Sequence, residues 1–543
     1  MSLKNFQFKT HNSKLITALI SGILMGLTVA PFNVWFLAWI ALAPLWVLIV
    51  NSAQTKKQSP LSSPNPPLSP SCPPPFLLAL AWGIGYHGLA LYWITGIHPM
   101  TWMGVPWLAS LGIALFCWTF ITLWGAALVA IWAIAMRTIS SQNVFTRVLI
   151  GTALWCGLEA LWSNGALWWS SLSYTQSPHN LVILHLGQLS GSTAVTFSIV
   201  AVNGLLAEAW INREDTKHAK KNFISFASWR FVNKYLGFAA GLLITLHLIG
   251  FSLYSGPLAQ PAETALKVGI IQGNVPNEIK LYPEGFRRAI EGYTTGYLTL
   301  ANQGINAVLT PEGALPFFQR DLKNTSLISA VQEKGIVAWI GAFGERGRSY
   351  TNSLFTFTGN GEIFSRYDKA KLVPIGEYIP FEQILGGIIQ RLSPLDEHQV
   401  PGSPNQVFNT PFGRVIVGIC YESAFSEQFR RQAAAGGQFI LSPSNDAHYS
   451  VAMPAQHHAQ DIMRAIEVDR WGVRATNTGY SAFVDPHGRT LWISGHNTYE
   501  THAETIYRRQ TQTFYVRWGD WLTPLLLGLT ALVWFIERQI KTD

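Results

Sequence analysis

The segment VIVGICYESAF, residues 415–425, decides the fold of the second half of this 543-residue chain. Its apolar, β-branched run predicts a buried strand, and the strand ends at Cys420, which Tyr421 and Glu422 follow directly. The chain has four cysteines. The other three lie in apolar or Pro-rich segments, so no disulfide partner lies near Cys420 in sequence. Cys420 is therefore a packing residue or a nucleophile, and this pattern alone leaves both open.

Similar short strands recur on both sides of this segment, from about residue 256 to residue 520. Apolar runs such as LKVGIIQGN, INAVLTPEGA and GIVAWIGAFGE end in polar or Gly-rich turns and alternate with helical patterns, which predicts an α/β domain. The stretch LFTFTGNGEIFSRYDK predicts a β-hairpin that turns at Asn360-Gly361. RQAAAGGQFILSP predicts a helix, a glycine turn and a buried strand.

The rest of the chain has the composition of a membrane protein. Hydrophobic residues make up 49% of the sequence and charged residues 13%, with 22 Trp and 30 Phe. We expect about eight transmembrane helices, because eight apolar runs approach the roughly 20 residues that cross a bilayer. These runs are residues 15–29, 35–50, 76–94, 107–135, 148–169, 184–210, 235–254 and 521–536. The Pro-rich residues 59–75 predict an extended loop between the second and third runs.

Lysine and arginine predict the orientation of these helices. They gather before the first run, in alternate connections and after the last run, whereas connections such as TGIHPMTWMGVP contain neither residue. By the positive-inside rule, both termini are cytoplasmic and the α/β domain faces outward. The expected domains are thus residues 1–255 and 521–543 in the membrane and residues 256–520 outside it. The net charge of +8 belongs to these connections, and without a basic stripe that carries interleaved aromatics we expect no nucleic-acid partner.

Three chemically capable residues follow predicted strands. Glu312 follows AVLTP, Lys369 follows the hairpin, and Cys420 ends the strand quoted above. Acyl transfer through a cysteine needs a nucleophile, a base and a cation near the developing oxyanion, and we expect the lysine to favour the thiolate. Each residue also has an ordinary interpretation, as a solvated turn glutamate, a surface lysine or a packed cysteine. Spacing alone does not decide between them.

Taken together, the three residues and their motifs resemble a known family. PEGALP, YDKAKLVPIGEYIPF and GICYES, in this order, resemble the nitrilase superfamily, whose fold is an α-β-β-α sandwich. The membrane runs, IIQGNVP, SNDA and QHHAQDIMRAIEVDRWGVRATNTGYSAFVDPHGR narrow the resemblance to the apolipoprotein N-acyltransferase family of bacteria, over nearly the whole chain. The resemblance implies an enzyme of the inner membrane with its catalytic domain on the periplasmic side.

The resemblance also implies a reaction in two steps. Cys420 would take an acyl chain from a phospholipid, typically phosphatidylethanolamine, and pass it from a thioester to the amine of a diacylglyceryl-cysteine lipoprotein. Glu312 would be the general base and Lys369 would stabilise the oxyanion. Four further positions match family residues that support the nucleophile or line the pocket: Asn352, Glu377, Tyr421 and Glu422. The sequence departs from the family at Thr310, at Leu281 and at residues 448–450, which puts the lipid-facing wall in question.

Other polar residues have simpler interpretations. Glu159 falls inside an apolar run, and we favour a hydrogen bond to a neighbouring helix, or a place near the membrane interface, over an ion path. His457, His458 and Asp461 mimic metal-ligand spacing on one predicted helix, but no further ligand at suitable spacing follows, so we expect no metal and no cofactor. Two rival functions stay open: a membrane-tethered amidase that uses water as acceptor, and a non-catalytic lipid-binding protein. Acyl transfer to a lipopeptide tests the first, and the activity of Cys420→Ser tests the second.

Overall fold

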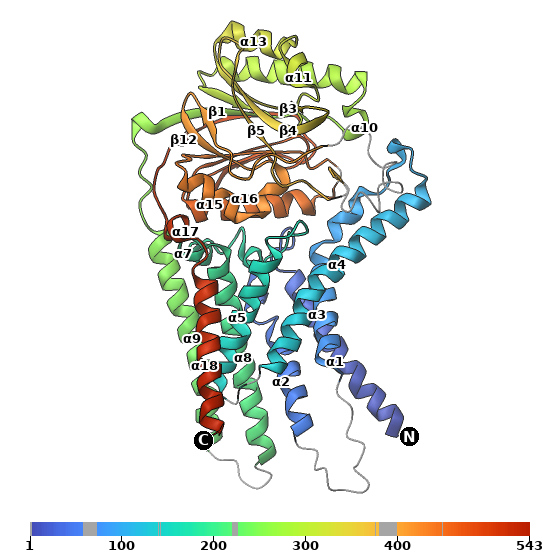
Figure 1. Cartoon of the computed structure of the whole chain (residues 1–543), viewed down its shortest axis with the longest axis vertical. Helices are drawn as coiled ribbons and strands as arrows, with labels where there is room; N and C mark the ends of the chain where they lie inside the picture. The colour runs from blue at the N-terminus through green and yellow to red at the C-terminus, as the bar shows by residue number, and fades with distance from the viewer. Residues whose placement is uncertain are drawn as a thin grey trace.

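The computed structural model describes residues 3–57, 73–139, 141, 143–219, 226–374, 376–378, 399–447 and 449–542. A bundle of apolar helices forms the lower part of the molecule in Figure 1, and a domain with two β-sheets lies on top of it. The segment 59–75, predicted as an extended loop, lies almost entirely outside the described residues, and so does His448.

The bundle has helical structure at each of the eight predicted runs. Within the described ranges, five stretches are long and apolar enough to cross a membrane: Trp35–Ser52, Trp107–Thr138, Val144–Trp162, Ser192–Arg213 and Lys234–Tyr254. The count of eight crossings stays a prediction. The helices are α1 (Leu3–Gly26), η1 (Trp35–Trp39), α2 (Ala43–Lys57), α3 (Pro75–Ala90), η2 (Tyr92–Ile97), η3 (Thr101–Met103), α4 (Trp107–Thr138), α5 (Val144–Trp162), η4 (Leu172–Gln176), α6 (Leu181–Leu184), α7 (Gly187–Ser190), α8 (Ser192–Ala219), α9 (Phe226–Tyr254) and α18 (Leu522–Thr542).

The sixth run, residues 184–210, differs from its prediction at its start. The long helix α8 begins at Ser192, and the preceding residues form the short helices α6 and α7. Gly191 separates α7 from α8 with a φ of +65°, a conformation that ends a helix and favours glycine. Apolar composition does not distinguish a spanning helix from short helices packed beneath another domain, which is why the prediction began too early.

The upper domain contains two six-stranded sheets within the part of the chain that the structure describes. In the first sheet β1, β2 and β3 are parallel and their neighbours antiparallel. In the second, β7, β8 and β9 form the parallel centre. The order of the first sheet is β12 (Glu500–Tyr507), β1 (Ala265–Gln272), β2 (Ala307–Leu309), β3 (Val337–Arg346), β4 (Ser349–Phe357), β5 (Ile363–Asp368), and that of the second is β11 (Thr490–Ile493), β10 (Ala482–Val484), β9 (Gly472–Thr476), β8 (Ile440–Ser444), β7 (Gly413–Val417), β6 (Phe408–Thr410).

Helices cover the outer face of each sheet, as Figure 1 shows for α11 and α13 above and for α15 and α16 below. Val268 and Trp339 of the first sheet pack with Val417 and Leu441 of the second in one buried cluster between the sheets. The predicted α-β-β-α sandwich is therefore confirmed. Its helices are η5 (Ala262–Thr264), α10 (Asn277–Lys280), α11 (Pro283–Ala301), α12 (Gln319–Leu322), α13 (Ser326–Lys334), η7 (Cys420–Ala424), α15 (Ser426–Ala434), α16 (Ala452–Val468) and α17 (Phe514–Trp518).

Helix α16 joins the two halves of the molecule. Its residues Met453 and Ile462 belong to the same buried apolar cluster as Trp93 and Leu186 of the bundle. The predicted hairpin is present as β4 and β5, with Gly361 in the left-handed region at φ +79°. Residues 310–312 follow the end of β2, residue 369 follows β5, and residue 420 follows β7.

Candidate active site

Lys369 directly follows β5, and its ammonium group contacts two of the predicted site residues. A third, Asn352, bonds to the same two carboxylates. Lys369 Nζ donates to Glu312 Oε1 at 2.8 Å and to Glu377 Oε1 at 2.7 Å. Asn352, on β4, donates from Nδ2 to the same two oxygens at 2.6 and 3.3 Å. Lys369 is 1% exposed and Glu312 is 7% exposed. Because water is nearly excluded, these charges act on one another with little screening.

Cys420 begins the turn η7, three residues beyond the end of β7 at Val417. Its φ of +52° lies in the left-handed region, which residues with a Cβ rarely adopt and which costs on the order of 1–3 kcal/mol. The surroundings hold this conformation, because His457 donates from Nε2 to the Cys420 carbonyl oxygen at 2.7 Å. A sharp, supported turn of this kind presents the side chain at the end of a parallel strand, where α/β folds collect functional groups.

Glu422 ties the turn of Cys420 to the turn of Lys369. It is fully buried, and its carboxylate accepts hydrogen bonds from both turns. The donors are Ile419 N at 2.8 Å, Ala370 N at 2.7 Å, Lys371 N at 3.1 Å and Tyr367 Oη at 3.2 Å. A carboxylate is needed here because the donors outnumber what a neutral amide oxygen accepts. Glu422 is thus a positioning residue, and the structure supplies a physical role for this predicted site residue.

The pKa of the Cys420 thiol is set by opposing effects. Burial and the charge of Glu312 raise it well above its ordinary value of 9.0, whereas Lys369 and the backbone amide of Asn445 lower it. Lys369 therefore favours the thiolate, as expected, but burial and Glu312 outweigh it and the resting group is a thiol. Burial lowers the pKa of Lys369, but Glu312 and Glu377 outweigh it and hold that pKa well above its ordinary range.

A second charged group lies beneath the cysteine. Asp446 accepts from Arg474 Nη2 at 3.1 Å, and its other oxygen lies 3.2 Å from His457 Nδ1. In the described part of the chain, ligand atoms of Cys420, Asp446 and His457 lie within 4.8 Å of one another. Arg474 and the Cys420 carbonyl already engage this aspartate and this histidine, so the donor set matches a hydrogen-bonded support for the turn.

The three helix residues that mimic metal spacing separate in space. His457 turns toward Asp446, His458 lies 2.9 Å from Thr490 Oγ1, and Asp461 accepts from Arg474 Nη1 at 2.7 Å. Each of the three side chains therefore has a different partner, and their sequence spacing does not describe one coordination site.

Tyr421 anchors the turn of Cys420 in the helix bundle. Its hydroxyl donates to the Ala166 carbonyl oxygen at 2.6 Å and accepts from Trp168 N at 3.1 Å. Its ring is parallel to that of Trp169, with 6.1 Å between centroids. Trp168 and Trp169 also line a small, mainly apolar cavity of about 20 Å³ between α3, α4 and α5. The residue after Cys420 therefore contacts the wall of a space in the bundle.

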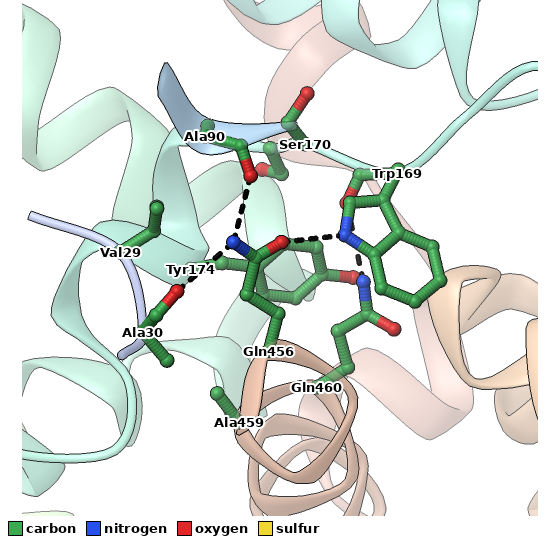
Figure 2. A pocket seen from close by; sticks show the side chains of 10 residues that line it. Val29, Ala30, Ala90, Trp169, Ser170, Tyr174, Gln456, Ala459 and Gln460 are labelled. Atoms are coloured by element: carbon green, nitrogen blue, oxygen red, sulfur yellow. Dashed lines mark hydrogen bonds between the residues drawn. The ribbon is translucent and has the colours of Figure 1, made fainter. Parts of the chain in front are cut away.

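Gln456 of α16 makes the join between the halves rigid (Figure 2). Its Nε2 donates to the carbonyl oxygens of Ala30 and Ala90 at 2.9 and 2.8 Å. Its Oε1 accepts from the indole nitrogens of Trp93 and Trp169 at 3.1 and 2.8 Å. All four hydrogen-bonding positions of this buried amide are used, which fixes the height and rotation of α16 above the bundle.

Sequence reasoning missed Lys280, the last residue of α10. Its Nζ donates to the main-chain oxygen of Glu312 at 3.3 Å, which brings a second ammonium group to the site. It also missed Asn445, whose amide faces the Cys420 sulfur. Asn445 directly follows β8, so its place after a strand was the available signal. Lys280 ends the short helix α10, eight residues beyond β1, and no comparable signal marks it.

Glu159 and the departing positions have structural partners. The Glu159 carboxylate accepts from Trp155, Ser171, Leu172 and Thr196, which agrees with the favoured interpretation of bonding between helices. Thr310 is buried, and its hydroxyl accepts from Gly341 N at 3.1 Å. Leu281 caps α10. Tyr449 meets Trp93 edge-on at 5.0 Å, so this departure lies where the two halves meet.

Comparisons with known proteins cover both halves of the chain. Residues 268–514 match the family described as Carbon-nitrogen hydrolase, and residues 21–63 and 68–205 match the Apolipoprotein N-acyltransferase N-terminal domain. The apolipoprotein N-acyltransferase of Nostoc sp. is 69% identical over 96% of this chain and 98% of its own length. That of Synechocystis sp. is 48% identical over 94% and 98%. A crystal structure of an amidase from Nesterenkonia sp. aligns over 48% of this chain and 96% of its own, at 18% identity and a TM-score of 0.36.

Proposed function

Because the chain belongs to the apolipoprotein N-acyltransferase family, we propose that Cys420 carries a fatty acyl group from a phospholipid to the N-terminal amine of a diacylglyceryl-cysteine lipoprotein. We assign the membrane part to residues 1–255 and 521–543 and the catalytic domain to residues 256–520. The reaction exchanges an ester for a thioester and the thioester for an amide, so each half-reaction has its own acceptor.

In the first half-reaction the Cys420 sulfur attacks the ester carbonyl carbon while Glu312 takes the thiol proton. The buried, protonated thiol makes this base necessary. Lys369 lies against Glu312 and donates to the oxyanion of the tetrahedral intermediate. When the C–O bond breaks, Glu312 returns the proton to the leaving oxygen, and a lysophospholipid departs. The acyl group stays on sulfur as a thioester.

In the second half-reaction the lipoprotein amine attacks the thioester carbon. Glu312 accepts a proton from the amine, the C–S bond breaks, and the sulfur regains a proton as the amide forms. The buried side-chain oxygen Oδ1 of Asn352 has no hydrogen-bond partner among the described residues, and it offers an acceptor to the second N–H of the amine. Glu377 keeps Lys369 charged and in place through both steps.

Both substrates are lipids, which places the reaction at a bilayer surface. The start of α1 and the end of α18 lie at the foot of the bundle, opposite the catalytic domain (Figure 1). Together with the cations in alternate connections, this arrangement supports cytoplasmic termini and a catalytic domain on the periplasmic face of the inner membrane. Phosphatidylethanolamine, an abundant membrane phospholipid, is the proposed donor.

The observation that carries the proposal is the double attachment of the Cys420 turn. Glu422 holds it to Lys369, and Tyr421 holds it to residues 166 and 168 of the bundle. A hydrolase that takes amides from water needs only the first attachment. The second holds the turn of Cys420 directly against the helix bundle, the part of the molecule that lipid chains reach.

Acyl transfer from labelled phospholipid to a diacylated lipopeptide tests the function. The purified wild-type protein should produce a triacylated peptide and a lysophospholipid in equal amounts. Cys420→Ala and Cys420→Ser should produce neither. Release of free fatty acid without peptide acylation would favour the amidase, and full triacylation by Cys420→Ser would favour a lipid-binding protein whose partner is catalytic.

A further inference from the structure

Lys280 is built firmly into the edge of the active site. It ends α10, whose first residue, Asn277, accepts from Asn445 Nδ2 at 3.2 Å. Gly285 permits a very close approach of α11 to this helix, because an added Cβ would lie 1.9 Å from the Ile279 carbonyl oxygen and 2.7 Å from Lys280 Cα. The backbone of Lys280 is therefore positioned by a fixed corner rather than by a free loop.

The ammonium group of Lys280 is charged, and not all of its N–H donors make hydrogen bonds to the described residues. Nζ donates at 3.3 Å to the main-chain oxygen of Glu312, and an added Cβ on Gly313 would lie 3.4 Å from it. No ion pair between Lys280 and a carboxylate occurs among the described residues. Burial lowers its pKa to about 8, while the charge of Glu312, and that of Cys420 when it is ionised, act in the opposite direction. The group is thus a cation at neutral pH, with donors to spare for an anion.

The proposed mechanism assigns the oxyanion to Lys369, which contacts Glu312, so Lys280 is left for a second anion. The other anion that enters the site is the phosphodiester of the donor, which is separated from the reacting ester by a few bonds of the glycerol. The diacylglyceryl acceptor carries no phosphate. On the basis of the proposed function, we infer that Lys280 binds the phosphodiester of the phospholipid, so that α10 and the residues beside Glu312 form the headgroup site for the donor.

Two donors distinguish this role from a structural one. Phosphatidylethanolamine carries the phosphodiester and p-nitrophenyl palmitate does not, yet both acylate a cysteine. For full-length protein in detergent micelles and phosphate-free buffer, the rate of acyl-enzyme formation is measured by intact mass. Lys280→Met should slow acylation by phosphatidylethanolamine about 10- to 100-fold, the value of one hydrogen bond between charged groups, and acylation by the neutral ester by less than about 3-fold.

Matched variants complete the test. Lys280→Arg should recover most of the phospholipid rate, and Lys323→Met, at an exposed lysine paired with Glu362, should match the wild type with both donors. An equal loss with both donors in Lys280→Met would overturn the headgroup assignment and leave Lys280 as a support for Glu312. Inorganic phosphate at matched ionic strength should slow acylation of the wild type by phosphatidylethanolamine more than it slows acylation of Lys280→Met, and equal inhibition of the two proteins would also overturn the assignment.

The proposed function and this inference fail in different ways. If the wild type forms no acyl-enzyme with either donor, the thioester mechanism is wrong whatever Lys280 does. If the wild type is acylated by both donors and Lys280→Met retains the full phospholipid rate, the mechanism stands and the headgroup site is wrong.

Discussion

At the scale of single residues, Glu312 and Lys369 act on the thiol of Cys420 with opposite sign. Glu312 raises the pKa of the thiol and Lys369 lowers it, while burial keeps it well above 9.0. The thiolate fraction, and with it the rate of alkylation, should therefore rise only in the alkaline range. Glu312→Gln should move the midpoint of this rise to lower pH, and Lys369→Met should move it to higher pH.

The measurement is the pH dependence of iodoacetamide alkylation, followed by intact mass. The protein should have its other three cysteines replaced by serine, because Cys117 is partly exposed and would also react. Midpoints that move in the same direction in both variants, or that stay unchanged, would show that these charges do not govern the sulfur.

Glu422 provides a second prediction at this scale. In Glu422→Gln the amide keeps the shape of the side chain, but one carboxylate oxygen becomes an NH₂ group. This group faces either Ile419 N or the amides of Ala370 and Lys371, which then lose their acceptor. Charge-assisted hydrogen bonds are each worth roughly 1.5–3 kcal/mol, so turnover should fall by about 10- to 100-fold or more. The pH midpoint of alkylation should also shift, because Lys369 and Cys420 lose their common support.

A structural role of Glu422 limited to stability gives a different result. In that case the thermal midpoint falls while turnover per folded molecule and the alkylation profile stay as in the wild type. The exposed pair of Lys323 and Glu362 offers a control: Glu362→Gln should change none of these quantities.

At the scale of elements, the positions where strands end were predictable from the sequence, but which of these ends lie close together was not. Apolar runs ending in polar turns placed Glu312 after β2, Lys369 after β5 and Cys420 after β7, and all three placements are confirmed. The 2.8 Å contact between Lys369 and Glu312 depends on sheet order and on the position of Glu377, which lie beyond local pattern. The left-handed φ of Cys420 has no sequence signal either, because its support comes from His457 in α16.

Helix α16 shows the same limit for burial. Its stretch contains Gln456, His457 and Arg464, which a sequence pattern assigns to a surface, yet all three are buried between the second sheet and the bundle. Polar residues are buried there because each meets a partner from another element, such as Ser192 for Arg464. A hydrogen bond between residues some 270 positions apart in the chain cannot be predicted from a local stretch of sequence.

The prediction for α16 concerns Gln456, which hydrogen-bonds to the bundle. Gln456→Leu fills a similar volume but leaves two carbonyl oxygens and two indole N–H groups without their buried partner. At roughly 1–3 kcal/mol for each group left unsatisfied, the variant should lose several degrees in its thermal midpoint in detergent. Acyl-enzyme formation should slow as well, because α16 also supports the Cys420 turn.

The matched control for this substitution is Gln303→Leu, at an exposed position after α11. It should leave the thermal midpoint and the acylation rate within error of the wild type. Equal midpoints for the two variants would mean that the hydrogen bonds of Gln456 do not hold the two halves together.

At the scale of the whole molecule, the proposed orientation has the catalytic domain outside the cytoplasm and both termini inside it. Glu291 is exposed on α11 of the catalytic domain, and Arg538 lies near the end of α18. In a background without Cys72, Cys117 and Cys156, Glu291→Cys should react with a membrane-impermeant maleimide on intact spheroplasts. Arg538→Cys should react only after permeabilisation. Labelling of Arg538→Cys on intact spheroplasts would reverse the orientation derived from the cationic connections.

The proposed function depends on the contact between the helix bundle and the domain that carries Cys420. One turn holds the sulfur, a glutamate fixes that turn to the cation, and a tyrosine fixes it to the bundle, so chemistry and membrane meet at a single residue. The most direct measurement is the intact mass of the purified protein after incubation with phospholipid alone. The mass should increase by one fatty acyl group, and the increase should be reversed by hydroxylamine and absent in Cys420→Ala. An adduct that persists in Cys420→Ala, or one that hydroxylamine leaves in place, would contradict this prediction.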